Sequence, residues 1–208
     1  MVGVLLRQPT MWGLTLTQGC VNYMNYVFLT WLPTYFVQAR GMSLMSAGVY
    51  SAIPYAAGVI LEIVFGNMSD RLLNPTGLRE GGRRNQVVAV TALSSAVLLI
   101  PRLHSEPAIL AVVTLALVCN TTTIMLMYSL TNDLVSDSRV TGTAFGILLC
   151  GGNTVGLAAP IVTGYIVKAT GRFDAAFAVA GALALAGSVL AFAGTRRRIT
   201  GLAPAGSG

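Results

Sequence analysis

Six long apolar runs constrain the fold of this chain more than any other feature. They cover roughly residues 11–37, 46–68, 86–103, 107–131, 141–167 and 173–194. At a rise of about 1.5 Å per residue, helices of this length cross a hydrocarbon core about 30 Å thick. Lipid cannot hydrogen-bond the backbone, so a spanning segment must be a helix or part of a closed barrel. Barrel strands are about ten residues long and alternate in polarity, so the unbroken runs predict an all-α polytopic membrane protein with six transmembrane helices.

The composition agrees with a membrane protein. Hydrophobic residues make up 54% of the 208 residues and charged residues only 10%, too little charge for a soluble domain of this size. The opening segment MVGVLLRQP carries one cation and no small-residue cleavage site, so we do not interpret it as a removable signal. Cys20, Cys119 and Cys150 lie in three different runs without the spacing of a metal site or disulfide, and we expect no metal and no cofactor.

The positions of the cations predict the orientation. With a cytoplasmic N-terminus, nine of the 13 Lys and Arg residues fall on the cytoplasmic side, which is the usual positive-inside excess. The nine are Arg7, Arg71, Arg79, Arg83, Arg84, Arg139, Arg196, Arg197 and Arg198, and the other four are Arg40, Arg102, Lys168 and Arg172. We therefore expect a cell (inner) membrane protein with both termini in the cytoplasm. The arginines lie in loops without interleaved aromatic residues, so the net charge of +6 indicates no nucleic-acid partner.

Amide and phenol side chains recur in four of the six runs. They are Gln18, Asn22, Asn25 and Tyr26 in the first, Tyr55 in the second, Asn120 and Tyr128 in the fourth, and Asn153 in the fifth. The interiors of the third and sixth runs carry only Ser and Thr as polar residues. Burying amides in lipid costs several kcal/mol unless they find partners or water. We expect the first, second, fourth and fifth helices to share a polar cavity, with the third and sixth outside against lipid. The alternative is that these groups only join neighbouring helices.

Prolines and glycines add to this pattern. Pro33, Pro54 and Pro160 lie inside the first, second and fifth runs, where each is expected to bend a helix. The fifth run also has small residues at four-residue spacing, which let another helix approach closely. These are Gly142 and Gly146, then Gly152, Gly156 and Gly164.

Residues 66–84, GNMSDRLLNPTGLREGGRR, form an island of charge between two apolar runs. The island resembles the cytoplasmic loop signature of the major facilitator superfamily, which joins the second and third helices of each six-helix half, with NPTGLREG inserted here. The residues of this motif, expected to act in gating, are Gly66, Ser69, Asp70, Arg71, Arg83 and Arg84. Asp70 is expected at the cytoplasmic end of its own helix, where the helix dipole disfavours an anion. We predict that it approaches the start of the fifth helix near Thr141, or pairs with a nearby arginine.

Two further stretches are similar to the anion:cation symporter branch of that superfamily. They are FLTWLPTYFVQARGMSLMSAGVYSAIPYAAG at 28–58 and GTAFGILLCGGNTVGLAAPIVTGYIVKATGRF at 142–173. The resemblance covers the C-terminal six-helix half of a twelve-helix transporter. It implies that residues 1–10 are the end of the central cytoplasmic loop and that residues 11–198 are the six-helix half, with a cytoplasmic loop at 69–85. Residues 199–208 would then be a disordered cytoplasmic tail.

The resemblance also implies a function. Relatives of this kind carry sugar acids and other small organic anions together with protons, and their carboxylate-binding arginine lies mainly in the N-terminal half. Gln18 and Asn153 correspond to substrate-contacting positions, and Asn22, Asn25, Tyr55 and Asn120 would line the same cavity. Tyr128 stands in YSLTND, where relatives often have Trp.

Glu62 is the one acid well inside an apolar run. It is a possible proton-titrating group at the inner mouth, and the alternative is a carboxyl that reaches the interface or bonds a neighbouring helix. The cavity residues include no cation, and neutral amides and phenols suit hydroxyl-rich ligands.

Other functions are open at this point. The chain could be an inert truncated product or a non-transporting membrane partner, because a major facilitator site lies between two halves. The N-terminal half would then belong to the full protein, be encoded separately, or be replaced in a homodimer. A six-helix membrane enzyme is a weaker alternative, since the only histidine, His104, lies in an outer loop and no Gly-x-Ser-x-Gly elbow exists. A channel would need rings of charge or a carbonyl filter.

Overall fold

The chain folds into a bundle of long helices in the computed structural model, which describes residues 2–72 and 81–199 and, of these, the side chains outside 65–72. The elements are α1 (Val2–Leu5), α2 (Pro9–Arg40), α3 (Leu44–Leu72), α5 (Gly82–Ser94), the 3₁₀ helix η1 (Ser95–Arg102), α6 (Glu106–Leu134), α7 (Ser138–Thr170) and α8 (Asp174–Gly194). Apart from the short α1, their ends lie within four residues of those expected from the apolar runs. The all-α prediction is confirmed.

Local chemistry sets the helix ends. Pro9 occupies the first turn of α2, where its missing N–H costs no hydrogen bond. Gly41 and Gly171 follow α2 and α7 with φ values of 67° and 66°, a left-handed conformation that glycine adopts without a steric penalty. The side chain of Asp137 accepts a hydrogen bond from the Arg139 backbone at 3.0 Å and caps the start of α7.

The third predicted helix is divided into α5 and η1. The Ser94 and Ser95 hydroxyls donate to the carbonyls of Thr91 and Ala92, at 2.7 and 2.6 Å. Such bonds compete with the helical ladder, and Pro101 farther along has no N–H to contribute. The last eight residues of this predicted helix, Ser95–Arg102, therefore form a tighter 3₁₀ helix.

Five segments in the described part of the chain have the length and apolar composition to cross a membrane. They are 44–64, 82–102, 106–134, 138–170 and 174–194. Helix α2 has 32 residues and is long enough, but Gln18, Asn22 and Asn25 lower its hydropathy. The helix with the most amide side chains is thus the least apolar of the long ones.

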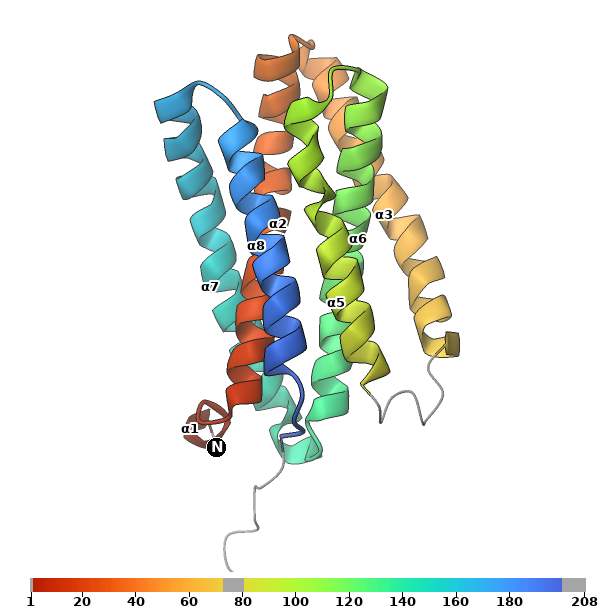
Figure 1. The fold of residues 1–208 in the computed structure, drawn as a ribbon, viewed down its shortest axis with the longest axis vertical. Helices are drawn as coiled ribbons and strands as arrows, with labels where there is room; N and C mark the ends of the chain where they lie inside the picture. The colour runs from red at the N-terminus through yellow and green to blue at the C-terminus, as the bar shows by residue number, and fades with distance from the viewer. Residues whose placement is uncertain (1, 73–80, 200–208) are drawn as a thin grey trace, which may run out of the picture.

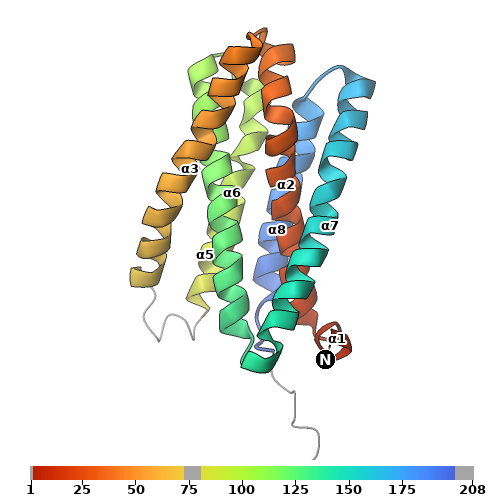
Figure 2. The ribbon, with the colours of Figure 1, turned by 180° about the vertical axis from the view of Figure 1, so that it is seen from behind.

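The long helices form two layers. Figure 2 shows α3, α6, α2 and α7 side by side, and Figure 1, from the opposite side, shows α5 and α8 in front of them. Helix α2 packs mainly on α7 and α8, α3 packs on α6, and α5 packs on both α6 and α8. The helices expected to carry polar faces therefore share one layer. Helices α5 and α8 cover the middle of its other side, and the outermost helices are α3 and α7.

Glycines allow the closest helix contacts. A Cβ atom placed on Gly13 of α2 would lie 2.7 Å from the Cα of Gly194 at the end of α8. Gly152 and Gly156 of α7 receive side chains of α2, so the expected close approach along the fifth helix is made by α2. Gly142 and Gly146 of the same stripe have nothing within 4 Å of an added Cβ and play no such part.

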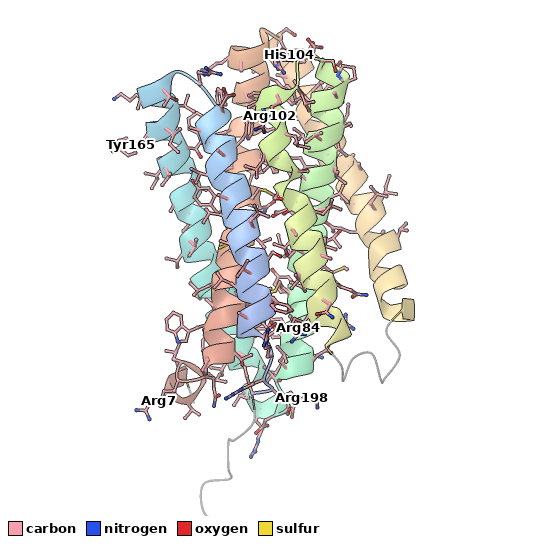
Figure 3. All side chains as sticks on the ribbon, in the orientation of Figure 1. Arg7, Arg84, Arg102, His104, Tyr165 and Arg198 are labelled. Atoms are coloured by element: carbon pink, nitrogen blue, oxygen red, sulfur yellow. The ribbon has the colours of Figure 1, made fainter. Side chains whose placement is uncertain are left out.

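The described cations gather at the two ends of the bundle. Arg7, Arg84 and Arg198 lie at the end where the described chain begins at Val2 and ends at Ile199, and Arg102 lies with His104 at the other (Figure 3). Ile199, which the sequence analysis assigns to the tail, is only 6% exposed, and its N–H donates to the Leu134 carbonyl at 2.9 Å. The chain is therefore held against the bundle as far as Ile199.

Candidate functional site

A polar layer crosses the middle of the bundle between two apolar clusters. The buried hydrophobic residues form one cluster toward each end of the helices. The clusters are separated at residues 15–22 of α2, 118–125 of α6 and 149–158 of α7. Asn120 is the central residue of α6, and Asn153 is next to the centre of α7. Amides predicted from separate apolar runs thus lie at one depth.

Four side chains in or next to this layer are linked by hydrogen bonds within α2 and from α2 to α7. The Gln18 Nε2 group donates to Asn22 Oδ1 at 3.0 Å, and Asn22 Nδ2 donates to Asn153 Oδ1 at 3.2 Å. The Tyr26 hydroxyl donates to the same Asn153 oxygen at 3.4 Å. Gln18, Asn22 and Tyr26 are spaced by four residues, which places them on one face of α2. We call Gln18, Asn22, Tyr26 and Asn153 the amide chain.

Glycines of α7 make room for the amide chain. A Cβ atom on Gly152 would lie 2.6 Å from the Cγ of Gln18, and one on Gly156 would lie 2.7 Å from the ring of Tyr26. Larger residues at these positions would push α2 away from Asn153. The small-residue spacing and the polar stripe, which the sequence presents as two separate patterns, form one contact in the fold.

The amide chain keeps hydrogen-bonding capacity unused. Asn153 is half-buried, and both of its side-chain hydrogen bonds use Oδ1, so its Nδ2 group has no partner within the described residues. The Gln18 side chain is fully buried and its Oε1 atom also has none. Buried polar groups normally find partners, so the unused acceptor of Gln18 and the unused donor of Asn153 mark a place suited to a polar ligand.

The other predicted cavity residues lie on α3 and α6. Asn120 is 1% exposed, and neither polar atom of its amide has a partner among the described residues. The hydroxyl of Tyr55 on α3 is also buried without a partner there. Tyr128 is half-buried and packs on Phe145 of α7 with ring centroids 6.1 Å apart. None of these three joins the amide chain by a direct hydrogen bond.

Asn25 and Glu62 lie outside the amide chain. Asn25 is half-buried on α2, one residue from Tyr26 but on a different face. Glu62 is half-buried on α3, next to the exposed Ile63. Neither residue is brought against Asn153.

The gating motif is described only in part. The side chains of Gly66, Ser69, Asp70 and Arg71 fall outside the described residues, and so does the predicted contact of Asp70. Arg83 pairs with Asp133 near the end of α6, with Nε and Oδ2 2.7 Å apart. Arg84 instead lies over the Phe192 ring of α8, with its guanidinium carbon 5.3 Å from the ring centroid.

The start of α7 has a cap of its own. Asp137 accepts a bond from the backbone N–H of Arg139, and the Arg139 guanidinium donates to both of its carboxylate oxygens. These bonds lower the pKa of Asp137, so its carboxylate keeps capping the helix at a lower pH than an ordinary Asp would. Neither the Arg83–Asp133 pair nor the Asp137 cap is among the features predicted from the sequence, although an Asp just before a helix, as Asp137 is, is a known capping signal.

We expect Asp133→Asn to lower the free energy of unfolding by about 1 kcal/mol, because its ion pair with Arg83 is partly shielded from water. The Arg83 side chain is 12% exposed and that of Asp133 is 35% exposed. The measurement is thermal unfolding of the purified chain in detergent. Asp137→Asn is the control with a smaller expected effect, since its Arg139 partner is 65% exposed. The exchanged pair Arg83→Asp with Asp133→Arg should recover part of the loss; equal losses in all variants would contradict a specific pair.

A pocket of about 340 Å³ lies at the end of the bundle opposite Val2 and Ile199. It is lined by residues of α2, η1, the η1–α6 connection and the α7–α8 turn, including Arg40, His104 and Arg172. None of the predicted substrate residues lines it. This pocket is separate from the polar layer.

Known proteins that are similar to this chain include three that are named as transporters. The probable sulfoacetate transporter of Cupriavidus necator is 34% identical over 176 residues, 83% of this chain and 40% of the relative. The probable galactarate/D-glucarate transporter of Escherichia coli is 32% identical over 197 residues, 94% of this chain and 43% of the relative. The hexuronate transporter of Bacillus subtilis is 33% identical over 187 residues, 88% of this chain and 44% of the relative. The chain is homologous to the sugar-acid and organic-anion transporters of the major facilitator superfamily.

The homology confirms the predicted resemblance to the sugar-acid and organic-anion transporters of the major facilitator superfamily. The relatives are named as transporters, so the prediction that the chain is not an enzyme is confirmed as well. The chain spans less than half the length of these relatives, as expected for one half of such a transporter. No protein-family model matches the chain.

Proposed function

We propose that this chain is the C-terminal six-helix half of a secondary transporter that moves a small organic anion together with protons. The observation that supports this most directly is the polar layer at mid-height, with unused hydrogen-bonding atoms on Asn153, Gln18 and Asn120. Transporters of this architecture bind substrate near the membrane midplane, between two repeats. Helix α2 then serves as the sixth span, with Gln18 and Asn22 turned toward α7.

The substrate class follows from the chemistry of the layer and the relatives. The Nδ2 group of Asn153 is a donor suited to a carboxylate or hydroxyl oxygen, and the Gln18 Oε1 atom is an acceptor suited to a hydroxyl. The named substrates of the relatives include galactarate, D-glucarate and hexuronate, which are hydroxylated carboxylates. We infer a sugar acid or related carboxylate as the ligand.

The charge of the ligand requires a second half. No Lys or Arg lies between Arg7 and Arg40, or between Arg139 and Lys168, so α2 and α7 offer an anion no cation at the level of the amide chain. An anion bound there without a cation would keep an uncompensated charge in a poorly solvated site. We propose that a complementary six-helix half supplies the cation and the proton-carrying acids, with Glu62 of this chain as an additional candidate proton site.

The orientation proposed here is N-in and C-in, in the cell (inner) membrane. One end of the bundle, with Val2 and Ile199, holds Arg7, Arg83, Arg84, Arg139 and the arginines at 196–198, while the other holds Arg40, Arg102, Lys168 and Arg172. This asymmetry supports a cytoplasmic location for the first end.

Reconstituted vesicles test the proposed function. We expect vesicles containing only this 208-residue chain to accumulate no D-glucarate above protein-free vesicles when a pH gradient is applied. Vesicles in which the chain is joined to the N-terminal half of a homologous transporter should show saturable accumulation, because only then do two repeats enclose the layer.

Two results would contradict this proposal. Saturable, pH-driven accumulation by the chain alone would support a homodimer and refute the half-transporter argument. Absence of accumulation with every folded complementary half would favour a non-transporting membrane protein. Size-exclusion chromatography of the joined protein in detergent is the control for its folding.

A further inference from the structure

Two arginines lie against one aromatic ring at the end of the bundle with Val2 and Ile199. The guanidinium carbon of Arg84, in α5, is 5.3 Å from the centroid of Phe192, in α8. That of Arg196, just after α8, is 4.7 Å from the same centroid. The two guanidinium carbons therefore lie no farther apart than about 10 Å, the sum of these distances. We call Arg84, Phe192 and Arg196 the arginine–phenylalanine cluster.

Neither arginine of the cluster is neutralised by a carboxylate within the described residues. Arg84 donates to the amide oxygen of Asn85 at 3.2 Å, and Arg196 donates to the Phe192 carbonyl at 3.3 Å. Cation–π contact with a ring is favourable but leaves both positive charges in place. Two like charges held this close attract an anion.

The cluster terminates an apolar stripe on α8. Leu185, Val189 and Phe192 are 43%, 66% and 45% exposed, and their spacing of four and three residues puts them on one helix face. Figure 3 shows Arg84 where the ends of α5 and α8 lie side by side. The two helices are joined higher up by a bond from the Ser188 hydroxyl to the Val88 carbonyl, 2.9 Å long. The seam thus presents exposed apolar side chains on the mid-bundle side of a pair of cations.

We propose that this seam is a binding site for one anionic phospholipid. The phosphodiester would lie between the guanidinium groups of Arg84 and Arg196, and an acyl chain would follow Val189 and Leu185 into the bilayer. Arginine pairs phosphate oxygens in a planar, two-bond geometry, and basic groups between membrane helices at the cytoplasmic side recognise anionic headgroups. The proposal needs α5 and α8 to face lipid but does not depend on transport activity.

The ligand of this seam is a lipid because the surface combines two cations with a stripe of exposed apolar side chains. A soluble anion would use the cations and leave the stripe of Leu185, Val189 and Phe192 without a function. A zwitterionic lipid would fit the stripe but would bring its own cation toward the two arginines. An anionic phospholipid satisfies both parts of the surface.

Native mass spectrometry of the purified full chain in detergent tests this site. The chain is mixed with phosphatidylglycerol or with phosphatidylcholine of the same acyl chains, and bound lipid is counted. We expect a roughly tenfold preference of one saturable site for phosphatidylglycerol, given the attraction of each basic side chain for an anionic headgroup. Arg84→Gln with Arg196→Gln should reduce this preference to near unity.

Matched variants separate the site from general charge and from misfolding. Arg102→Gln removes one exposed cation at the opposite end and should leave the preference unchanged. Arg84→Lys with Arg196→Lys keeps both charges and should keep most of it. The proposal is overturned if the Gln double variant keeps the full preference, if Arg102→Gln abolishes it, or if millimolar inorganic phosphate displaces the lipid as well as added phosphatidylglycerol does.

Discussion

Replacing Asn153 by Asp in the joined, transport-competent protein is expected to lower kcat/KM for a sugar acid by roughly 100-fold. The Oδ1 atom of Asn153 accepts bonds from Asn22 and Tyr26, so the Nδ2 group is the atom left for a ligand. The Asp side chain keeps the acceptor but has no donor, and it faces the anionic ligand with a second negative charge. A hydrogen bond to a charged group contributes about 1.5–3 kcal/mol, which corresponds to about 10–150-fold in affinity.

Two further variants test whether the loss of transport is specific to the Asn153 amide. Asn153→Ala removes the donor without adding charge and should cost about tenfold or more, but less than the Asp variant. Thr154→Ala changes the next residue, whose exposed side chain donates to the Cys150 carbonyl of its own helix, and should have little effect. Uptake of labelled D-glucarate into vesicles measures all three. If Thr154→Ala and Asn153→Asp lower uptake equally, Asn153 has no special role.

Replacing Gly13 by Ala is expected to destabilise the bundle by about 1–3 kcal/mol, the usual cost of overpacking a tight contact. The added Cβ would lie 2.7, 2.8 and 2.9 Å from the Cα, carbonyl carbon and oxygen of Gly194. These are backbone atoms, which cannot rotate away as the end of a side chain can. Helices α2 and α8 must therefore separate, and the effect should exceed that of most single substitutions in this chain.

The matched control for Gly13 is Gly146→Ala on α7. An added Cβ there has nothing within 4 Å, so Ala should be neutral or stabilising by up to about 1 kcal/mol through its higher helix propensity. Thermal unfolding in detergent, followed by circular dichroism, compares the two variants. A similar melting temperature for both would mean that the Gly13–Gly194 contact does not support the fold.

Helix positions and types are properties that this sequence determines by itself. Apolar length identifies the spans because the hydrocarbon core has a fixed thickness and the backbone must bond within itself there. Helix ends follow from single residues such as Pro9, Asp137 and Gly171, whose effects act within one turn. The spacing of Gln18 and Asn22 likewise predicts a polar face on α2 from one helix alone.

Pairings between helices are decided only by the tertiary structure. Periodicity tells which face of a helix is polar but not which other helix meets it, so the sequence could not assign Asn153 as the partner of Asn22 rather than Asn120. That choice depends on how closely two backbones approach, which Gly152 and Gly156 permit for α2 and α7. Contacts between residues far apart in the chain, such as Gly13 with Gly194, have no local signal. They form because helices of fixed length must pack closely, and a glycine at each of these two positions lets the backbones of α2 and α8 meet.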